Sequence, residues 1–213
     1  MIAQSKQAVE LFQMAWNYVE TAGFIGEVEW LRARSATEFT ETDLLRETAW
    51  VLLCSGFRES VIRERFDYIS LSFCDWESSD AIVASYPACV DAAFAAFHNS
   101  SKLRAIFETA QYVSSVGFQT LKPRIQLNPL SEIQELPRIG AVTSRHLAKN
   151  LGFDVAKPDR HLQRLTQQLG YGNVDQLCGQ IAQAFDTSIA VVDVVLWRYL
   201  SAQPRKLVDL GGP

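Results

Sequence analysis

"LPRIGAVTSRHLAKNLGFDVAKPDRHLQRL", residues 136–165, combines turn residues, basic residues and helical spacing within one short segment. Pro137 and Gly140 indicate a tight turn, and a basic segment with helical spacing follows that turn. Pro158 and Asp159 interrupt the chain again just before another helical segment. The stretch therefore predicts a helix, a hairpin, a second helix and, after a short break, the start of a third.

Helical spacing of apolar residues extends over almost the whole chain. One stripe predicts a helix over residues 101–116, and two nearly continuous apolar runs predict buried helices over residues 42–57 and 188–203. Alternating patterns are never longer than a few residues, and the chain has no Asn-Gly or Asp-Gly hairpin turn. We therefore expect an all-α fold.

The helix boundaries around the hairpin are predicted from turn and capping residues. Pro123 and Asn128-Pro129 indicate a loop. Ser131, with Gln134 three residues later, fits a capping box for a short helix over residues 131–136. The helix after the hairpin is expected to begin near residue 142 or 143 and to stop at Gly152.

Composition places the chain among ordinary globular proteins. It has 213 residues, of which 48% are hydrophobic and 21% charged, and no run of 18 apolar residues predicts a membrane-spanning helix. The first 20 residues are amphipathic and contain two glutamates, whereas a signal peptide would need a basic start and a continuous apolar centre. We expect a cytoplasmic protein, associated with the nucleoid if it is bacterial.

The cysteines are scattered and form no closely spaced pair of the kind that binds zinc or an iron–sulfur cluster. We expect free, mostly buried thiols at all four positions: Cys54, Cys74, Cys89 and Cys178.

Positive charge gathers in one part of a chain whose net charge is −4. Residues 122–164 hold eight Lys or Arg and four Asp or Glu. Such asymmetry is typical of a face that meets a polyanion, although many charged faces are simply solvated.

The hairpin can hold an anion. A helix that begins after a tight turn exposes backbone N–H groups at the positive end of its dipole, and Gly140 would let a phosphate come close to them. Arg145 and Lys149, four residues apart, would add phosphate contacts from one helix face. The alternative is a plain connection between two antiparallel helices.

This stretch resembles the signature of the helix-hairpin-helix base-excision DNA glycosylases, which include endonuclease III, the adenine-mismatch glycosylase, the 8-oxoguanine glycosylases and the alkyladenine glycosylases. The strong resemblance covers about 30 residues, and a weaker one spans roughly residues 40–200, where "AWVLLCSGFRESV" resembles an early helix of the family. The matching positions are Leu136, Pro137, Ile139, Gly140, Thr143, Asp159, His161 and Arg164.

The resemblance implies a monomeric, two-lobed protein that binds double-stranded DNA containing a lesion. One lobe would be the helical bundle of residues 41–152, which ends in the hairpin, and the other would combine residues 1–40 with 153–213. Asp159 would lie at the mouth of a DNA-binding cleft between them. The implied DNA contacts are Arg138, Ile139, Gly140, Val142, Thr143, Arg145, Lys149, His161 and Arg164.

The chain departs from the family pattern in four ways. Arg138 stands where the first hairpin glycine is usual, and it either strains the turn or adds a phosphate ligand. Val142 stands where the members that also cleave the strand carry their imine-forming lysine, and Lys149 lies about two helical turns further on. Gly56 replaces a glutamine that helps to fill the gap in the DNA. The four-cysteine cluster of endonuclease III is absent, since no cysteine follows Cys178.

Asp159 is open to two interpretations that do not exclude each other. It can simply cap the helix that follows it. It can also act as a fixed anion beside the sugar, because cleavage of an N-glycosidic bond develops positive charge there.

A base flipped out of the stack needs an aromatic or apolar pocket, although most aromatic residues belong to cores. The candidates for this base pocket are Trp50, Phe57, Arg58 and Trp197.

The sequence thus predicts a DNA glycosylase that releases a damaged or mispaired base and leaves an abasic site without cleaving the strand. By resemblance it needs no metal or organic cofactor for the chemistry and has no iron–sulfur cluster, although a monovalent cation at the hairpin is plausible. The main alternative is a DNA-binding module that keeps the hairpin and has lost base excision, which Arg138 and Gly56 favour. A third is a helical protein unrelated to DNA.

Overall fold

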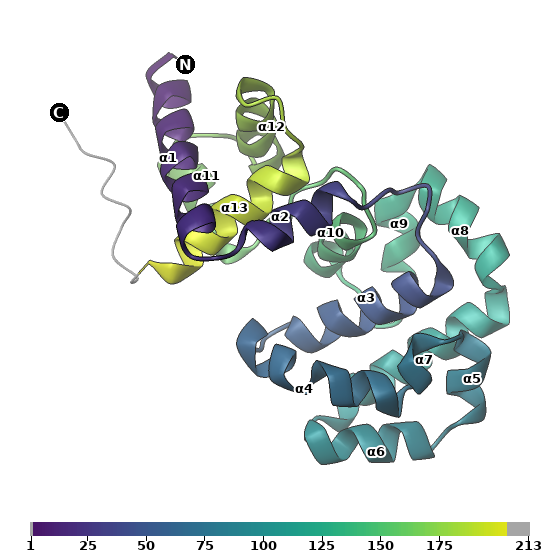
Figure 1. Ribbon diagram of the computed structural model, residues 1–213. Coiled ribbons are helices and arrows are strands. Elements are labelled where there is room, and N and C mark those ends of the chain that lie inside the picture. Colours follow the sequence, from purple (N-terminus) through teal and green to yellow (C-terminus); the bar gives the residue numbers. More distant parts are fainter. Residues whose placement is uncertain (1, 204–213) are drawn as a thin grey trace. The chain divides into compact units, whose positions relative to one another are not determined.

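The computed structural model describes residues 2–203, which form helices joined by turns (Figure 1). No strand occurs among these residues. This confirms the prediction of an all-α fold.

The chain folds as two compact units. Unit 1 combines the described residues up to Arg34 with those from Gly152 onward, and unit 2 comprises Ser35–Leu151. The sequence predicted that the lobe ending in the hairpin would span residues 41–152, so the predicted boundaries differ by six residues at its start and by one residue at its end. The linker ahead of residue 41 belongs to unit 2 because Phe39 is buried and packs edge-on against Phe118, with ring centroids 6.0 Å apart.

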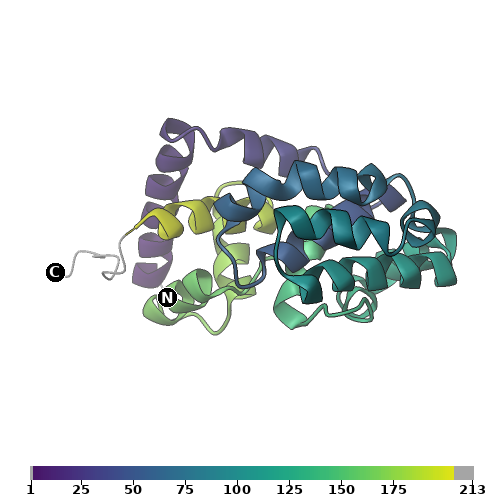
Figure 2. The same ribbon diagram turned by 90° about the horizontal axis from the view of Figure 1, so that it is seen from below.

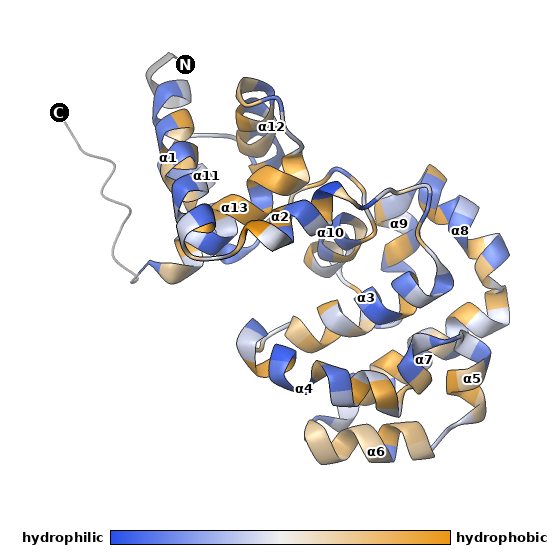
Figure 3. Cartoon of the chain, viewed as in Figure 1, coloured by the Kyte–Doolittle hydropathy of each residue, from blue (hydrophilic) through white to orange (hydrophobic). Residues whose placement is uncertain are grey.

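Unit 1 is built around one apolar helix, α13. The other four helices of the unit all pack against α13, and both views place α1 beside it (Figures 1 and 2). Hydrophobic residues follow one another along α13 (Figure 3), and Val192 and Leu196 are completely buried. The five helices of unit 1 are α1 (Ile2–Thr21), α2 (Ile25–Arg32), α11 (Arg160–Gln168), α12 (Val174–Ala184) and α13 (Ile189–Ala202).

Unit 2 is a bundle in which α3 and α7 are central. Helix α3 packs against α4, α7 and α10, while α7 also packs against α5, α6 and α8. Thr40 caps α3, because its Oγ1 accepts from the Asp43 N–H and the Asp43 carboxylate accepts from the Thr40 N–H. The elements are α3 (Glu41–Cys54), α4 (Glu59–Ser72), the 3₁₀ turn η1 (Cys74–Trp76), α5 (Ser79–Ala84), α6 (Ala88–Ala96), α7 (Ser100–Val116), α8 (Phe118–Leu127), α9 (Pro129–Gln134) and α10 (Ala141–Asn150).

The long apolar helices lie where the sequence predicts them, whereas two boundaries near the hairpin were predicted wrongly. Pro123 lies inside α8 and not in a loop, because burial of Leu121 and Ile125 on the same helix outweighs the lost backbone hydrogen bond. Ser131 does not cap α9, which begins two residues earlier with proline at its first turn. The Ser131 hydroxyl instead donates to the Asn128 carbonyl oxygen, 3.2 Å away.

The four cysteines form no disulfide bond with one another. Cys89 and Cys178 are buried, and Cys54 and Cys74 are half-buried. Among the described helices, none is long and apolar enough to cross a membrane on its own. Helices α12 and α13 meet that test only when taken together, and they are bent by 105° at their junction.

Candidate functional site

The hairpin between α9 and α10 is anchored by two apolar side chains. Leu136 and Ile139 are 2% and 6% exposed, and the Ile139 N–H donates to the Leu136 carbonyl oxygen at 3.1 Å. Arg138 lies between them, and its side chain is 57% exposed. The turn therefore buries its leucine and isoleucine in unit 2 and directs its arginine outward.

Arg138 adopts a left-handed backbone, with φ of +63°. For a residue with a Cβ this conformation costs roughly 1–2 kcal/mol, which glycine would avoid. The Arg138 Nε lies 3.6 Å from the Glu108 Oε2, which is a weak ion pair between two partly exposed groups. The turn is therefore strained at the position where the helix-hairpin-helix glycosylases carry glycine. Contact of Arg138 with a phosphate stays a prediction.

Helix α10 begins without a side-chain cap. Its N-cap residue is Gly140, and the first hydrogen bond inside the helix joins the Ser144 N–H to the Gly140 carbonyl oxygen at 2.8 Å. The backbone of Gly140, with φ of −95° and ψ of 180°, suits any residue, and an added Cβ would meet no atom within 4 Å. Neither the turn nor its neighbours require glycine here. A residue without a side chain does, however, allow an anion to approach the first amides of α10.

The residues predicted to bind phosphate along α10 are not equally accessible. Val142 is 41% exposed, and Thr143 and Arg145 are half-buried. Lys149 is only 7% exposed, so it does not lie on the outer face of the helix. Burial therefore gives no support to the predicted contact of Lys149 with DNA. The burial of Lys149 was not predicted from the sequence, because lysine side chains are mostly exposed in folded proteins.

Asp159 caps α11. Its Oδ1 accepts hydrogen bonds from the backbone N–H groups of His161 at 2.8 Å and Leu162 at 3.0 Å, which confirms the capping interpretation. Among the described residues, no donor is bonded to its Oδ2. The half-buried carboxylate thus has one oxygen fixed by the helix start and one available to another group.

Two further aspartates, whose role was not predicted from the sequence, fix the segment before Asp159 to α13. The Asp193 Oδ1 accepts from the Lys157 N–H at 3.0 Å, and Asp193 is 1% exposed. The Asp154 Oδ1 accepts from the N–H of Ala190, in the first turn of α13, at 2.9 Å. The sequence pattern that indicates this role is the single acid, Asp193, inside the apolar run "VVDVV". A carboxylate buried in such a run needs hydrogen-bond donors.

His161 lies beside Asp159 in a basic environment. Burial lowers its pKa from the ordinary value of 6.5; the Asp159 carboxylate opposes this shift, while Arg160, Arg164 and Lys157 add to it. Arg164 is exposed, in keeping with its predicted contact with DNA, which stays untested. The arrangement favours a neutral imidazole near pH 7.

The candidate base-pocket residues are divided between the two units. In unit 2, Trp50 packs edge-on against Phe66 at 5.0 Å between ring centroids, and Phe57 is 42% exposed. Arg58 is exposed at the start of α4. In unit 1, the guanidinium carbon of Arg198 lies 4.6 Å from the ring centroid of Trp197. A pocket formed by Trp50, Phe57, Arg58 and Trp197 stays a prediction.

Gly56 follows α3 with φ of +81°. An added Cβ would have space, since no atom lies within 4 Å, but the left-handed backbone would be strained for any other residue. The turn after α3 therefore gives a local reason for glycine at this position, independent of any resemblance to the glycosylases.

In comparisons with known proteins, no family model and no curated protein sequence matches this chain. The resemblance of residues 136–165 to the helix-hairpin-helix glycosylases therefore depends on the quoted residues themselves.

We expect Arg138→Gly to raise the free energy of unfolding by about 0.5–1 kcal/mol, because glycine removes the strain at φ of +63° while making the unfolded chain more flexible. Arg138→Ala is the matched control, since it removes the same side chain but keeps the strain. Chemical denaturation measures both. Equal stability of the glycine and alanine variants would contradict the interpretation of strain.

We expect His161 to titrate below pH 6.5, and to titrate lower still in Asp159→Asn, because that substitution removes the favourable carboxylate. Because the unfolded state binds this proton more tightly, the stability contributed by neutral His161 is complete above pH 6.5 and is lost as the pH falls through the lower pKa of the folded state. NMR titration of the imidazole measures the pKa. An unchanged or higher pKa in Asp159→Asn would show that the carboxylate does not act on His161.

Proposed function

We propose that this protein is a DNA glycosylase that hydrolyses the N-glycosidic bond of a damaged or mispaired base and leaves an abasic site. The observation that carries the proposal is the start of α10 at Gly140, which has no side-chain cap and where an added Cβ would meet no atom within 4 Å. Such a helix start after a tight turn binds the phosphates of a nucleic-acid backbone without reading its sequence. The proposed partner is double-stranded DNA that contains the damaged or mispaired base.

Asp159 supplies the proposed chemistry. When the bond between the sugar C1′ and the base nitrogen breaks, positive charge develops on the sugar, and a fixed carboxylate nearby stabilises it. The Oδ1 of Asp159 is held by two amides, which leaves Oδ2 to face the sugar or to orient water. The water oxygen then bonds to C1′, one water proton is released, and the base leaves with the bonding electron pair and takes up a proton.

The proposed reaction stops at the abasic site. Strand cleavage through an imine requires an amine at the reacting sugar. Val142, at the position of the family's lysine, is an exposed apolar residue and cannot form that imine.

A DNA-binding module without excision activity is the second candidate. The strained Arg138 and the left-handed Gly56 favour it, because both depart from the pattern of the active family at turns where the backbone conformation matters. It shares the hairpin and differs from the glycosylase only in lacking base release.

Incubation of the protein with duplexes that carry alkylated, deaminated or oxidised bases, followed by hot alkali, separates the two candidates. We expect alkali-dependent cleavage at one class of lesion, and its loss in Asp159→Asn by several orders of magnitude, since asparagine still caps α11 but carries no charge. Duplex affinity should remain. Asp175→Asn, which removes a carboxylate from an exposed position on α12 in the same unit, is the control and should keep the activity.

Binding to duplex DNA without base release on the whole panel would establish the module instead. Cleavage before alkali treatment would contradict the proposal that the reaction stops at the abasic site. Absence of salt-dependent duplex binding would exclude both candidates.

A further inference from the structure

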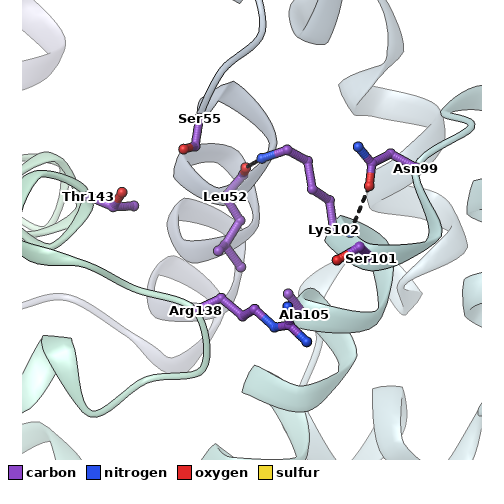
Figure 4. Close-up of a pocket in the computed structure, with 8 residues that line it drawn as sticks. All are labelled: Leu52, Ser55, Asn99, Ser101, Lys102, Ala105, Arg138 and Thr143. Carbon is purple, nitrogen blue, oxygen red and sulfur yellow. Dashed lines mark hydrogen bonds between the residues drawn. The ribbon is translucent and has the colours of Figure 1, made fainter.

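An open pocket of about 300 Å³ lies within unit 2 beside the hairpin (Figure 4). It is formed where α3 ends, α7 begins and the hairpin leads into α10. The Leu52 and Ala105 side chains form its apolar part. The polar lining residues are Ser55, Asn99, Ser101, Lys102, Arg138 and Thr143.

The charged residues that line this pocket are both positive. Lys102 comes from α7 and Arg138 from the hairpin, and no aspartate or glutamate among residues 2–203 lines the pocket. Glu108, the ion-pair partner of Arg138 at 3.6 Å, lies further along α7 and is not a lining residue. The pocket therefore presents two cations and several hydroxyl and amide groups without a carboxylate of its own.

The ammonium of Lys102 is only partly compensated by the protein. Its Nζ donates to the Leu52 carbonyl oxygen and lies 5.6 Å from the ring centroid of Phe57. Burial lowers the pKa of Lys102, and the nearby Cys54 opposes that shift. An anion in the pocket would restore part of the charge stabilisation that the lysine loses when it leaves water.

Two helix starts add to the positive potential of the pocket. Asn99 is the N-cap of α7, and Ser101 lies in the first turn of that helix. Thr143 lies in the first turn of α10, which has no side-chain cap. The positive ends of two helix dipoles therefore reach the pocket that the two cations line.

We propose that this pocket binds one phosphate group, with Arg138 and Lys102 as its charged ligands and the hydroxyls of Ser101 and Thr143 as neutral donors. Arginine suits this role because its planar guanidinium can donate two parallel hydrogen bonds to phosphate oxygens. The site also gives a reason for a strained arginine at the tip of the hairpin, since glycine there would remove a ligand. The phosphate site itself is argued from the pocket alone. The identification of its ligand as a DNA phosphate rests on the proposed function.

Titration of the full chain with inorganic phosphate, followed by ³¹P NMR at constant ionic strength, tests the site. Lys102→Met and Arg138→Met should each weaken phosphate binding about tenfold, the effect expected when one charge-assisted hydrogen bond is lost. Lys102→Met also loses the hydrogen bond to Leu52, so this variant could fail to fold. In that case Arg138→Met decides the outcome, because it keeps the backbone conformation and removes a mostly exposed side chain. Arg104→Met is the matched control, because Arg104 is exposed on α7 and does not line the pocket.

Equal binding by the protein and both pocket variants, or an equal loss in Arg104→Met, would overturn the proposal, as would absence of phosphate binding. Competition then identifies the source of the phosphate. Undamaged duplex DNA should displace inorganic phosphate if the site holds a backbone phosphate, and displacement only by small phosphate compounds would identify a free phosphate as the ligand. Asp159→Asn should bind phosphate normally, so loss of base release and loss of this site remain distinguishable.

Discussion

The hydrogen bond from the Lys157 backbone amide to the buried carboxylate of Asp193 is the constraint on which the placement of Asp159 depends. A carboxylate that is 1% exposed is stable only when donors surround it, so α13 holds the segment that carries its donor. Asp154 ties the beginning of the same segment to the first turn of α13. The chain is thus fixed at two points before it reaches the cap of α11.

This arrangement gives Asp159 two roles at once. As a cap it stabilises the start of α11 through one oxygen, and the two amides that hold this oxygen also restrict the direction of the other. An anion that is fixed before a reaction begins stabilises developing charge more effectively than one that must reorient. A structural cap and a proposed catalytic group are therefore compatible in one side chain.

The hairpin illustrates a different compromise. Gly140 stands at a position that neither the backbone nor the neighbours restrict, whereas Arg138 occupies the left-handed conformation that glycine would adopt without strain. The fold alone does not explain why Gly140 lacks a side chain where space is open. It also does not explain why an arginine occupies the strained position 138. Both are explained if the first amides of α10 and the arginine side chain face an anion.

Much of the fold was predictable from the sequence, because long apolar helices are specified by periodicity. The helix expected over residues 101–116 is α7, and the two apolar runs are α3 and α13. Short elements were less predictable: Pro123 lies within α8 because packing outweighs local preference. The cap formed by Asp159 was predicted from its neighbours in the sequence, whereas Asp193 and the pocket at Lys102 depend on segments that meet only in the folded chain.

Amide hydrogen exchange in Asp193→Ala tests the central claim, that the Asp193 carboxylate holds Asp159 in place, most directly. We expect faster exchange at Lys157 and also at His161 and Leu162, whose amides bond to Asp159. The Gln176 amide, bonded to the Asn173 cap of α12, should exchange as before. Faster exchange at Lys157 with unchanged protection of His161 and Leu162 would contradict the claim, because Asp159 would then keep its position without Asp193.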